Sequence, residues 1–328
     1  MGRIACIDVG TVTCRVAVAD VEGGRVTRLA KSSTIVNLGE GLTQTGRISS
    51  QAIERLLSCV DAGLEAARSA GAESVCCTLT SASRDAANSD ELLAELADRG
   101  LRAQVIPGDI EARLTFLGVS QDFPGQTILV ADNGGGSTEL ALGRLEADGL
   151  DLAAVRSVDV GCRRVTDMFL SREDPPNAED LAKAHAFAAK LLGAAADELG
   201  LREGGADALV CTGGTATSLV AMEAQLKVYD SAFVHLHELT LESTSALEEQ
   251  LAHRTLADRA KMIGLQPQRA PVILAGTIIV GELMRVLGFD ALRVSESDLL
   301  FGLSLTADAV ASGRPSPLPW EPTLAPLA

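Results

Sequence analysis

One local pattern occurs twice in this chain and restricts its possible folds more than any other feature. Asp8-Val9-Gly10-Thr11 and Asp132-Asn133-Gly134-Gly135-Gly136-Ser137-Thr138 each follow an apolar, strand-like run. Another β-rich run follows the glycines in both places, whereas the glycines of a Rossmann or Walker site open a helix. The recurrence predicts two α/β domains of one kind, each with a β-hairpin loop that can hold phosphate. We expect the two loops to face each other across a cleft.

Length and composition agree with two domains. The chain has 328 residues, of which 47% are apolar and 22% charged, which is enough apolar material for two cores. The formal net charge of −16 disfavours nucleic acid and anionic membranes as partners. A polyanionic ligand would have to be held locally, by backbone amides, a few arginines and a metal ion.

The sequence predicts a cytoplasmic protein. Its seven cysteines are an odd number without metal-ligand spacing and are expected to be reduced thiols, with Cys76 and Cys77 on opposite faces of one strand. Asp8 interrupts the apolar run near the start, so no signal peptide is expected. The longest apolar run, Pro271–Gly281, ends at Glu282 and is too short to span a bilayer.

Periodicity and turn residues predict where the elements and domains begin and end. Helices are expected at Gln51–Arg68, Ser89–Arg99, Asp109–Val119, Cys162–Leu170, Ala178–Leu199, Ala216–Ala224, Leu239–Ala252 and Val272–Leu287, with strands between them and a last helix from about Asp298. Residues 1–125 with about 296–312 should form the first domain and 126–295 the second. Residues 313–328 are proline-rich and are set apart as a tail.

The second glycine loop is the strongest chemical signal. Gly134, Gly135 and Gly136 let backbone N–H groups approach an anion without a Cβ in the way, and Ser137 and Thr138 add hydroxyl donors. Asp132 and Glu139 bracket the loop with carboxylates suited to Mg²⁺. The alternative, a flexible hairpin with two solvated acids, leaves the glycine triplet unexplained, because glycines weaken a strand pair.

The first loop is a candidate because it repeats the second. Gly10, Thr11 and Thr13 are candidate phosphate contacts, and Asp8 is a third candidate metal ligand. Arg15 could reach a phosphate or could be a charge on the exposed side of a strand.

Three further segments carry candidate groups beside an ordinary structural interpretation. Ser81 and Arg84 follow a strand and suit an oxyanion, or form a helix cap with a surface arginine. Glu111 in a helix first turn fits a general base, although capping chemistry alone explains an acid there. Thr212 followed by Gly213, Gly214 and Thr215 could place amides at a helix N-terminus, or could be a tight turn. The histidines receive no role.

Taken together, these motifs resemble the exopolyphosphatase/guanosine pentaphosphate phosphatase (Ppx/GppA) family over residues 3 to about 305. The resemblance rests on these segments in order: Ile7–Gly10, Leu38–Leu42 with Thr45-Gly46, Thr80–Asn88, Gly108–Leu114, Asp132–Leu140, Gly161-Cys162, Thr212–Thr215, and Arg269-Ala270 with Ile273. It implies an actin/hexokinase-type α/β fold of two domains and Mg²⁺-dependent attack of water on a terminal phosphoanhydride. It makes Glu111 the general base, Asp132 and Glu139 metal-site acids, and the glycines, Ser137, Thr138 and Arg84 phosphate contacts.

The resemblance also implies inorganic polyphosphate or guanosine pentaphosphate as substrate and a homodimer as the assembly. The chain departs from the family pattern at several positions. Val12 replaces an asparagine of the first loop, Asn37 replaces an arginine, Ile110 replaces an acid beside Glu111, and Leu300-Phe301 stands where Arg-Glu is common. The resemblance is to the short, two-domain form of the family.

Two other functions remain open from the sequence. An acetate-kinase-like or sugar-kinase-like phosphotransferase shares the two loops, and the Gly213–Thr215 turn with Ala275-Gly276 could form its adenosine pocket. A polyphosphate or alarmone sensor that has lost catalysis would explain Val12 and Asn37. Retention of Glu111, Asp132 and Glu139 favours the hydrolase.

Overall fold

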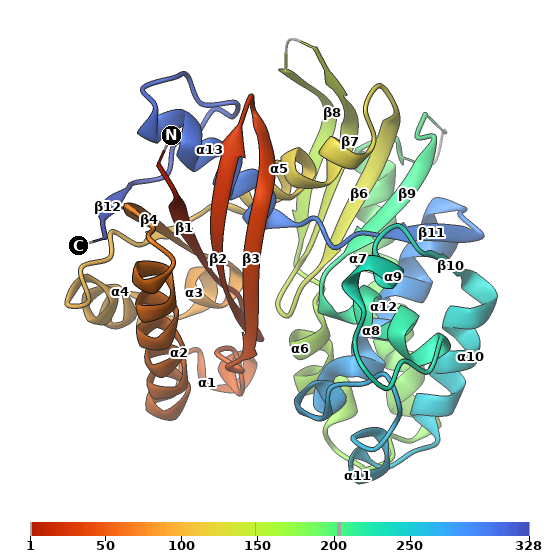
Figure 1. Cartoon of the computed structure of the whole chain (residues 1–328). Coiled ribbons are helices and arrows are strands. Elements are labelled where there is room, and N and C mark those ends of the chain that lie inside the picture. Colours follow the sequence, from red (N-terminus) through yellow and green to blue (C-terminus); the bar gives the residue numbers. More distant parts are fainter. Residues whose placement is uncertain (1, 148, 202–204, 328) are drawn as a thin grey trace. The chain divides into compact units, whose positions relative to one another are not determined.

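Two structural units, each built on one six-stranded mixed sheet, make up the chain (Figure 1). This computed structural model describes residues 2–147, 149–201 and 205–327. The first unit consists of Met1–Pro124, Leu145–Leu150 and Asp298–Ala328, and the second consists of Gly125–Arg144 and Asp151–Ser297. Residues 1 and 328, the ends of the predicted division, lie outside the described residues.

In the first unit, the strand order is β12-β4-β1-β2-β3, and β5 pairs with β4. Its strands are β1 (Ile4–Val9), β2 (Thr13–Glu22), β3 (Arg25–Ile35), β4 (Ser74–Leu79), β5 (Gln104–Val105) and β12 (Ala325–Pro326). Its helices are α1 (Leu42–Thr45), α2 (Ser50–Ser69), α3 (Ser81–Asp85), α4 (Ser89–Ala97), α5 (Gly108–Val119), the 3₁₀ turn η1 (Ser120–Asp122) and α13 (Leu299–Ala311).

Residues 313–328 are part of the first unit rather than a separate tail. Ala325 and Pro326 pair antiparallel with β4, and the side chains of Leu318 and Ala325 are buried. The prolines and the lack of periodicity predicted an irregular tail. Proline is nevertheless tolerated in a strand at the edge of a sheet. β12 is such an edge.

The first sheet is covered on both faces, as the alternation of its strands requires. Ile7 and Cys77 face one core, shared with α2 and α4, whereas Cys6 and Cys76 face the other, shared with α5 and α13. The predicted opposite orientation of Cys76 and Cys77 is therefore confirmed. Helices α5 and α13 lie against each other so closely that a Cβ at Gly302 would be 1.9 Å from the Leu114 carbonyl oxygen.

In the second unit, the strand order is β10-β11-β9-β6-β7-β8. Its strands are β6 (Thr127–Asn133), β7 (Thr138–Glu146), β8 (Gly149–Val158), β9 (Ala208–Thr212), β10 (Glu238–Thr240) and β11 (Ala291–Val294). Its helices are α6 (Cys162–Val165), the π-helical turn η2 (Thr166–Leu170), α7 (Ala178–Glu198), α8 (Gly214–Glu223), α9 (Ser231–Val234), α10 (Leu241–Ala252), α11 (Leu256–Arg259), the 3₁₀ turn η4 (Pro267–Arg269) and α12 (Ala270–Leu287).

The predicted recurrence is confirmed by the pairing of the strands. In the first unit, β1 pairs antiparallel with β2 and parallel with β4. In the second unit, β6 pairs antiparallel with β7 and parallel with β9. Asp8 lies opposite Arg15 in the first hairpin, and Asp132 lies opposite Glu139 in the corresponding place of the second. The glycine loops thus connect equivalent strands of two similar sheets.

Local differences from the sequence prediction are confined to short segments. Leu239 belongs to strand β10, and helix α10 begins at Leu241 because Thr240 caps it by accepting a hydrogen bond from the Ser243 N–H. The segment Cys162–Leu170 is one turn of α-helix followed by a π-helical turn. The four-residue helices α9 and α11 have too few residues to show a period of 3.6.

Helix α12 is the central helix of the second core. Together with η4, it is long and apolar enough to cross a membrane by length and composition. However, 78% of its most apolar 18-residue stretch is buried inside the structure, as in the core helix of a globular unit. It lies against α7, α8 and α10. The apolar run of the sequence ends at Glu282, but the helix continues to Leu287.

Glu282 forms part of an ionic cluster that joins three helices. On α7, the His185 Nδ1 lies 2.8 Å from Glu282 Oε1 of α12, and its Nε2 lies 2.8 Å from Glu248 Oε1 of α10. Arg285 also donates to Glu282, at 2.7 Å. Hydrogen bonds with Glu248 and then Glu282 raise the pKa of His185, against the opposing effect of burial.

We therefore expect His185 to stabilise the second unit at low pH. A raised folded-state pKa means that the stabilisation is complete below the unfolded pKa, about 6.5, and is lost as the pH rises through the folded value. Urea midpoints measured from about pH 6 to about pH 8.5 should fall in wild type, and His185→Gln should flatten this slope. His253→Gln, at an exposed histidine, is the control. Parallel slopes in wild type and His185→Gln would refute this role.

Candidate functional site

In the second glycine loop, the carbonyl groups of all three glycines accept hydrogen bonds from residues of helix α6. The turn is closed by the Gly134 N–H, which donates to the Ser137 carbonyl at 3.0 Å. The carbonyl of Gly134 accepts from the Cys162 N–H at 3.0 Å, and that of Gly135 accepts from the N–H groups of Arg163 and Arg164, at 2.8 and 3.2 Å. The Gly136 carbonyl accepts from Arg164 Nε at 2.8 Å.

These hydrogen bonds orient three consecutive backbone donors. In a planar trans peptide, the C=O of one residue and the N–H of the next point in opposite directions. The N–H groups of Gly135, Gly136 and Ser137 therefore point away from α6, on a common side of the loop. Within residues 2–147, 149–201 and 205–327, the structure gives these three groups no acceptor. Three converging N–H groups form a cradle for an anion.

Gly161 allows this arrangement because it has no side chain. A Cβ at Gly161 would lie 2.5 Å from backbone atoms of both Gly135 and Gly136. Its φ of −142° is ordinary extended backbone, so only the contact with the loop demands glycine. In the sequence, Gly161 stood out only as part of the family motif.

The two acids that bracket the loop are side by side. Asp132 and Glu139 are register partners in the β6–β7 hairpin, so their side chains emerge on the same face of the sheet. Both are buried. Ser157 Oγ donates to Glu139 Oε1 at 2.7 Å, and Asp132 Oδ1 would lie 3.1 Å from a Cβ at Gly213. Thr138, a predicted phosphate contact, donates its hydroxyl to the Val160 carbonyl at 2.6 Å.

The first glycine loop follows the same plan. The Gly10 N–H donates to the Thr13 carbonyl at 2.9 Å, as in the other turn. The carbonyl of Thr11 accepts from the Gly39 N–H at 2.8 Å, and that of Val12 accepts from the N–H groups of Val36 and Asn37, each at 2.9 Å. By the same peptide geometry, the N–H groups of Val12 and Thr13 point away from the connection after β3.

Asn37 has a structural explanation that the sequence did not show. Its φ is +48°, a left-handed conformation that asparagine tolerates better than most residues. Arg55, on α2, donates its Nε–H to the Val36 carbonyl at 2.8 Å and an Nη2–H to the Asn37 carbonyl at 3.4 Å. A guanidinium thus reaches this connection from α2, although position 37 itself is no arginine.

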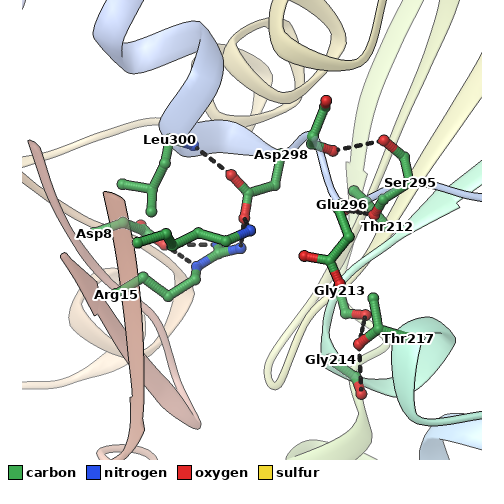
Figure 2. A network of polar contacts seen from close by, with 12 residues as sticks. Asp8, Arg15, Thr212, Gly213, Gly214, Thr217, Ser295, Glu296, Asp298 and Leu300 are labelled. Carbon is green, nitrogen blue, oxygen red and sulfur yellow. Dashed lines mark hydrogen bonds and ion pairs between the residues drawn. The ribbon is translucent and has the colours of Figure 1, made fainter. Parts of the chain in front are cut away.

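Arg15 lies in an ion cluster rather than on an exposed strand surface (Figure 2). Its Nε and Nη2 donate to Asp8 Oδ2 at 2.9 and 2.6 Å, and its Nη1 donates to Asp298 Oδ2 at 3.0 Å. Lys31 also binds Asp298 Oδ2, at 3.1 Å. Burial raises the pKa of Asp8, and Arg15 opposes that rise. Burial would also raise the pKa of Asp298, but Lys31 and Arg15 outweigh it, so that pKa is lowered.

Glu111 and Arg84 come together within the first unit. Glu111 lies in the first turn of α5, which begins after Pro107, and its side chain is largely buried. Arg84, on α3, donates Nη1–H groups to Glu111 Oε2 at 2.7 Å and to the Ile106 carbonyl at 2.9 Å. Ser81 is buried in the first turn of the same short helix. Nothing in the sequence indicated that Arg84 and Glu111 are in contact. This contact fixes the orientation of the Glu111 carboxylate.

The third glycine turn begins helix α8 in the second unit. Gly213 has a φ of +101°, and a Cβ there would be 2.8 Å from the Asn133 carbonyl oxygen. The Arg269 guanidinium lies over Gly214, 1.9 Å from the position of an added Cβ, and Thr215 is buried against Gly276 of α12. Figure 2 shows Thr217 Oγ1 turned back to the carbonyls of Gly213 and Gly214.

The structure therefore assembles the predicted residues into two sets. The first unit contains Asp8, Gly10, Thr11, Thr13, Arg15, Ser81, Arg84 and Glu111, and the second contains Asp132, Gly134, Gly135, Gly136, Ser137, Thr138, Glu139, Gly213, Gly214 and Thr215. Sequence reasoning missed Arg164, Lys31 and Asp298, because nothing in their local sequence indicates the distant groups that they contact.

Comparison with known proteins shows which family this chain resembles. A model of the Ppx/GppA phosphatase family matches residues 17–305. Exopolyphosphatase 2 of Mycobacterium tuberculosis is 35% identical over 320 residues, covering 93% of this chain and 98% of that protein. A guanosine-5'-triphosphate,3'-diphosphate pyrophosphatase of Photobacterium profundum is 34% identical over 186 residues, covering 55% of this chain and 37% of that protein.

The fold agrees with these matches. The crystal structure of an exopolyphosphatase from Cytophaga hutchinsonii superposes with a TM-score of 0.82 at 25% identity, covering 95% of this chain and 99% of that one. The predicted α/β fold with two actin-like domains is thus confirmed. The chain belongs to the Ppx/GppA phosphatase family.

Proposed function

We propose that this protein is a Mg²⁺-dependent hydrolase that releases the terminal phosphate of inorganic polyphosphate, guanosine pentaphosphate or both. The observation that carries the proposal is the cradle formed by the N–H groups of Gly135, Gly136 and Ser137. Fixed donors of this kind stabilise the charge that develops on phosphoryl oxygens. Family membership supports the reaction class, since one relative is named an exopolyphosphatase and another a guanosine-5'-triphosphate,3'-diphosphate pyrophosphatase.

Glu111 is proposed to orient the attacking water and to accept its proton. A general base must present a carboxylate oxygen in a fixed direction, and Arg84 holds Oε2 of Glu111 at 2.7 Å. Burial of Glu111 at the start of α5 limits competition from bulk water. Arg84 remains a predicted phosphate contact as well, and its second hydrogen bond, to the Ile106 carbonyl, holds its guanidinium in place.

The acids of both units suit Mg²⁺ as oxygen donors. Asp8 Oδ1 is fully buried and has no hydrogen-bond partner among the described residues, as expected for an oxygen that faces a cation or its bound water. In the second unit, Asp132 and Glu139 place two buried carboxylates on one face of the sheet, as a separate set of oxygen donors. In the described part of the chain, no three acidic, histidine or cysteine side chains form a complete metal site, so water and phosphate oxygens would have to complete the shell. Bound Mg²⁺ would neutralise charge on the transferred phosphoryl group.

Phosphate release from purified protein tests the proposal directly. Long polyphosphate, short polyphosphate and guanosine pentaphosphate should be compared with Mg²⁺ present and after its removal by a chelator. Release of phosphate without any acceptor is expected, and it would exclude an obligatory phosphotransferase. Tight binding of one of these ligands with no release over hours would contradict the hydrolase and indicate a sensor.

A further inference from the structure

We infer that Arg164 is a positioning residue for the anion cradle, and that it acts through its Nε–H rather than through its positive charge. This inference rests on the proposed function. The carbonyls of Gly134 and Gly135 are held by backbone N–H groups of α6, whereas the Gly136 carbonyl is held by the Arg164 side chain. The orientation of the last peptide in the cradle therefore depends on one side chain.

The geometry explains why this peptide needs to be held. The hydrogen bond from Arg164 Nε to the Gly136 carbonyl measures 2.8 Å, and it sets the direction of the Ser137 N–H on the opposite edge of the same peptide plane. Rotation of the peptide between Gly136 and Ser137 changes ψ of Gly136 and φ of Ser137. Because Gly136 has no Cβ, its ψ is less restricted than that of any other residue, and this peptide needs a partner to fix its orientation. A flip would turn a carbonyl oxygen toward the bound phosphate in place of a donor, which replaces attraction by repulsion.

The charge of Arg164 has a different environment from its Nε–H. The guanidinium Nη2 lies 4.0 Å from Asp159 Oδ1, and the Asp159 side chain is 81% exposed. An ion pair that loose and solvated contributes little. The Arg164 side chain itself is 21% exposed, and its Nε end points back into the loop.

Two substitutions separate the donor from the charge. Glutamine places its Nε2 three bonds beyond Cβ, where arginine has Nε, so Arg164→Gln keeps an N–H donor for the Gly136 carbonyl and removes the charge. Lysine has a methylene there, so Arg164→Lys keeps the charge and removes the donor. Matched control variants are Arg156→Gln and Arg156→Lys, at an exposed arginine of β8 that pairs with Glu198.

Steady-state kinetics with the preferred substrate should show kcat of Arg164→Lys reduced by roughly 10²-fold with KM changed much less, as for the loss of one oxyanion donor. Arg164→Gln should stay within a few-fold of wild type. The reverse ranking would assign the role to the charge, and unchanged kcat in both variants would remove Arg164 from the site. Circular dichroism and thermal midpoints of all four variants identify any loss of folded protein.

A second measurement keeps this inference separate from the proposed reaction. Tripolyphosphate can be titrated into ¹⁵N-labelled wild type and both Arg164 variants while the Ser137 amide resonance is followed. A large shift of that resonance in wild type and in Arg164→Gln, lost in Arg164→Lys, is expected even if no phosphate is released. A Ser137 amide that shifts equally in all three proteins would overturn the positioning role. Absence of turnover in wild type, by contrast, would count against the proposed function alone.

Discussion

Glu111→Gln should lower kcat by roughly 10²–10⁴-fold, the usual contribution of a general base, while KM changes little. The amide has nearly the same shape as the carboxylate, and its oxygen can still accept the hydrogen bond from Arg84, now 2.7 Å from Oε2. What it loses is the ability to take a proton from water. The effect should therefore appear in the chemical step and leave ligand binding largely intact.

Asp109→Asn provides the matched control for this experiment. Asp109 is also an acid in the first turn of α5, but its side chain is exposed. If the charge at the helix N-terminus were all that mattered, both amides would have similar and small effects. Phosphate release by the purified variants distinguishes the two cases. It should be measured at saturating substrate, which gives kcat, and at low substrate concentration, which gives kcat/KM. Full turnover by Glu111→Gln would take Glu111 out of the mechanism.

Gly161→Ala is the second change for which a large loss is expected. The new Cβ would lie 2.5 Å from the backbone of Gly135 and Gly136, a distance at which the loop has to move. Movement of the loop breaks its hydrogen bonds to α6 and turns the cradle donors away from the phosphate. We expect kcat to fall by at least roughly 10²-fold, since the loss of a single oxyanion donor costs that much. Overpacking should also lower the free energy of unfolding by about 1–3 kcal/mol.

Gly281→Ala tests whether any glycine-to-alanine change in the second unit is harmful. Gly281 lies inside α12, and the nearest atoms to its Cβ would be at the flexible end of the Arg285 side chain, the closest at 3.2 Å. Alanine is the better helix former, so this variant should keep its activity and unfold at a slightly higher temperature. Urea unfolding and phosphate release of both variants make the comparison. Wild-type kcat in folded Gly161→Ala would show that the α6 contact does not shape the cradle.

The sequence by itself determined the repeat and the chemical character of the loops. Strand periods of two residues, runs of apolar residues and glycine clusters are local signals, and each reflects a backbone requirement that can be recognised without knowing the fold. For this reason the strands around Gly10 and Gly134, the helix that carries Glu111 and the turn at Gly213 were all predicted near their observed places. The short helices and the β12 edge strand were not, because segments of two to four residues show no periodicity.

Only the tertiary structure decided which groups act together. Arg15 meets Asp298 across 283 residues of sequence, and Arg84 meets Glu111 across 27. The requirement for glycine at position 161 comes from the backbone of a loop on another strand pair, and the Arg164 donor is directed at a carbonyl 28 residues away. Such contacts depend on how helices and strands pack, and no local preference of the chain encodes them. The loops could thus be predicted from the sequence, whereas the groups that hold them in place could be identified only in the folded protein.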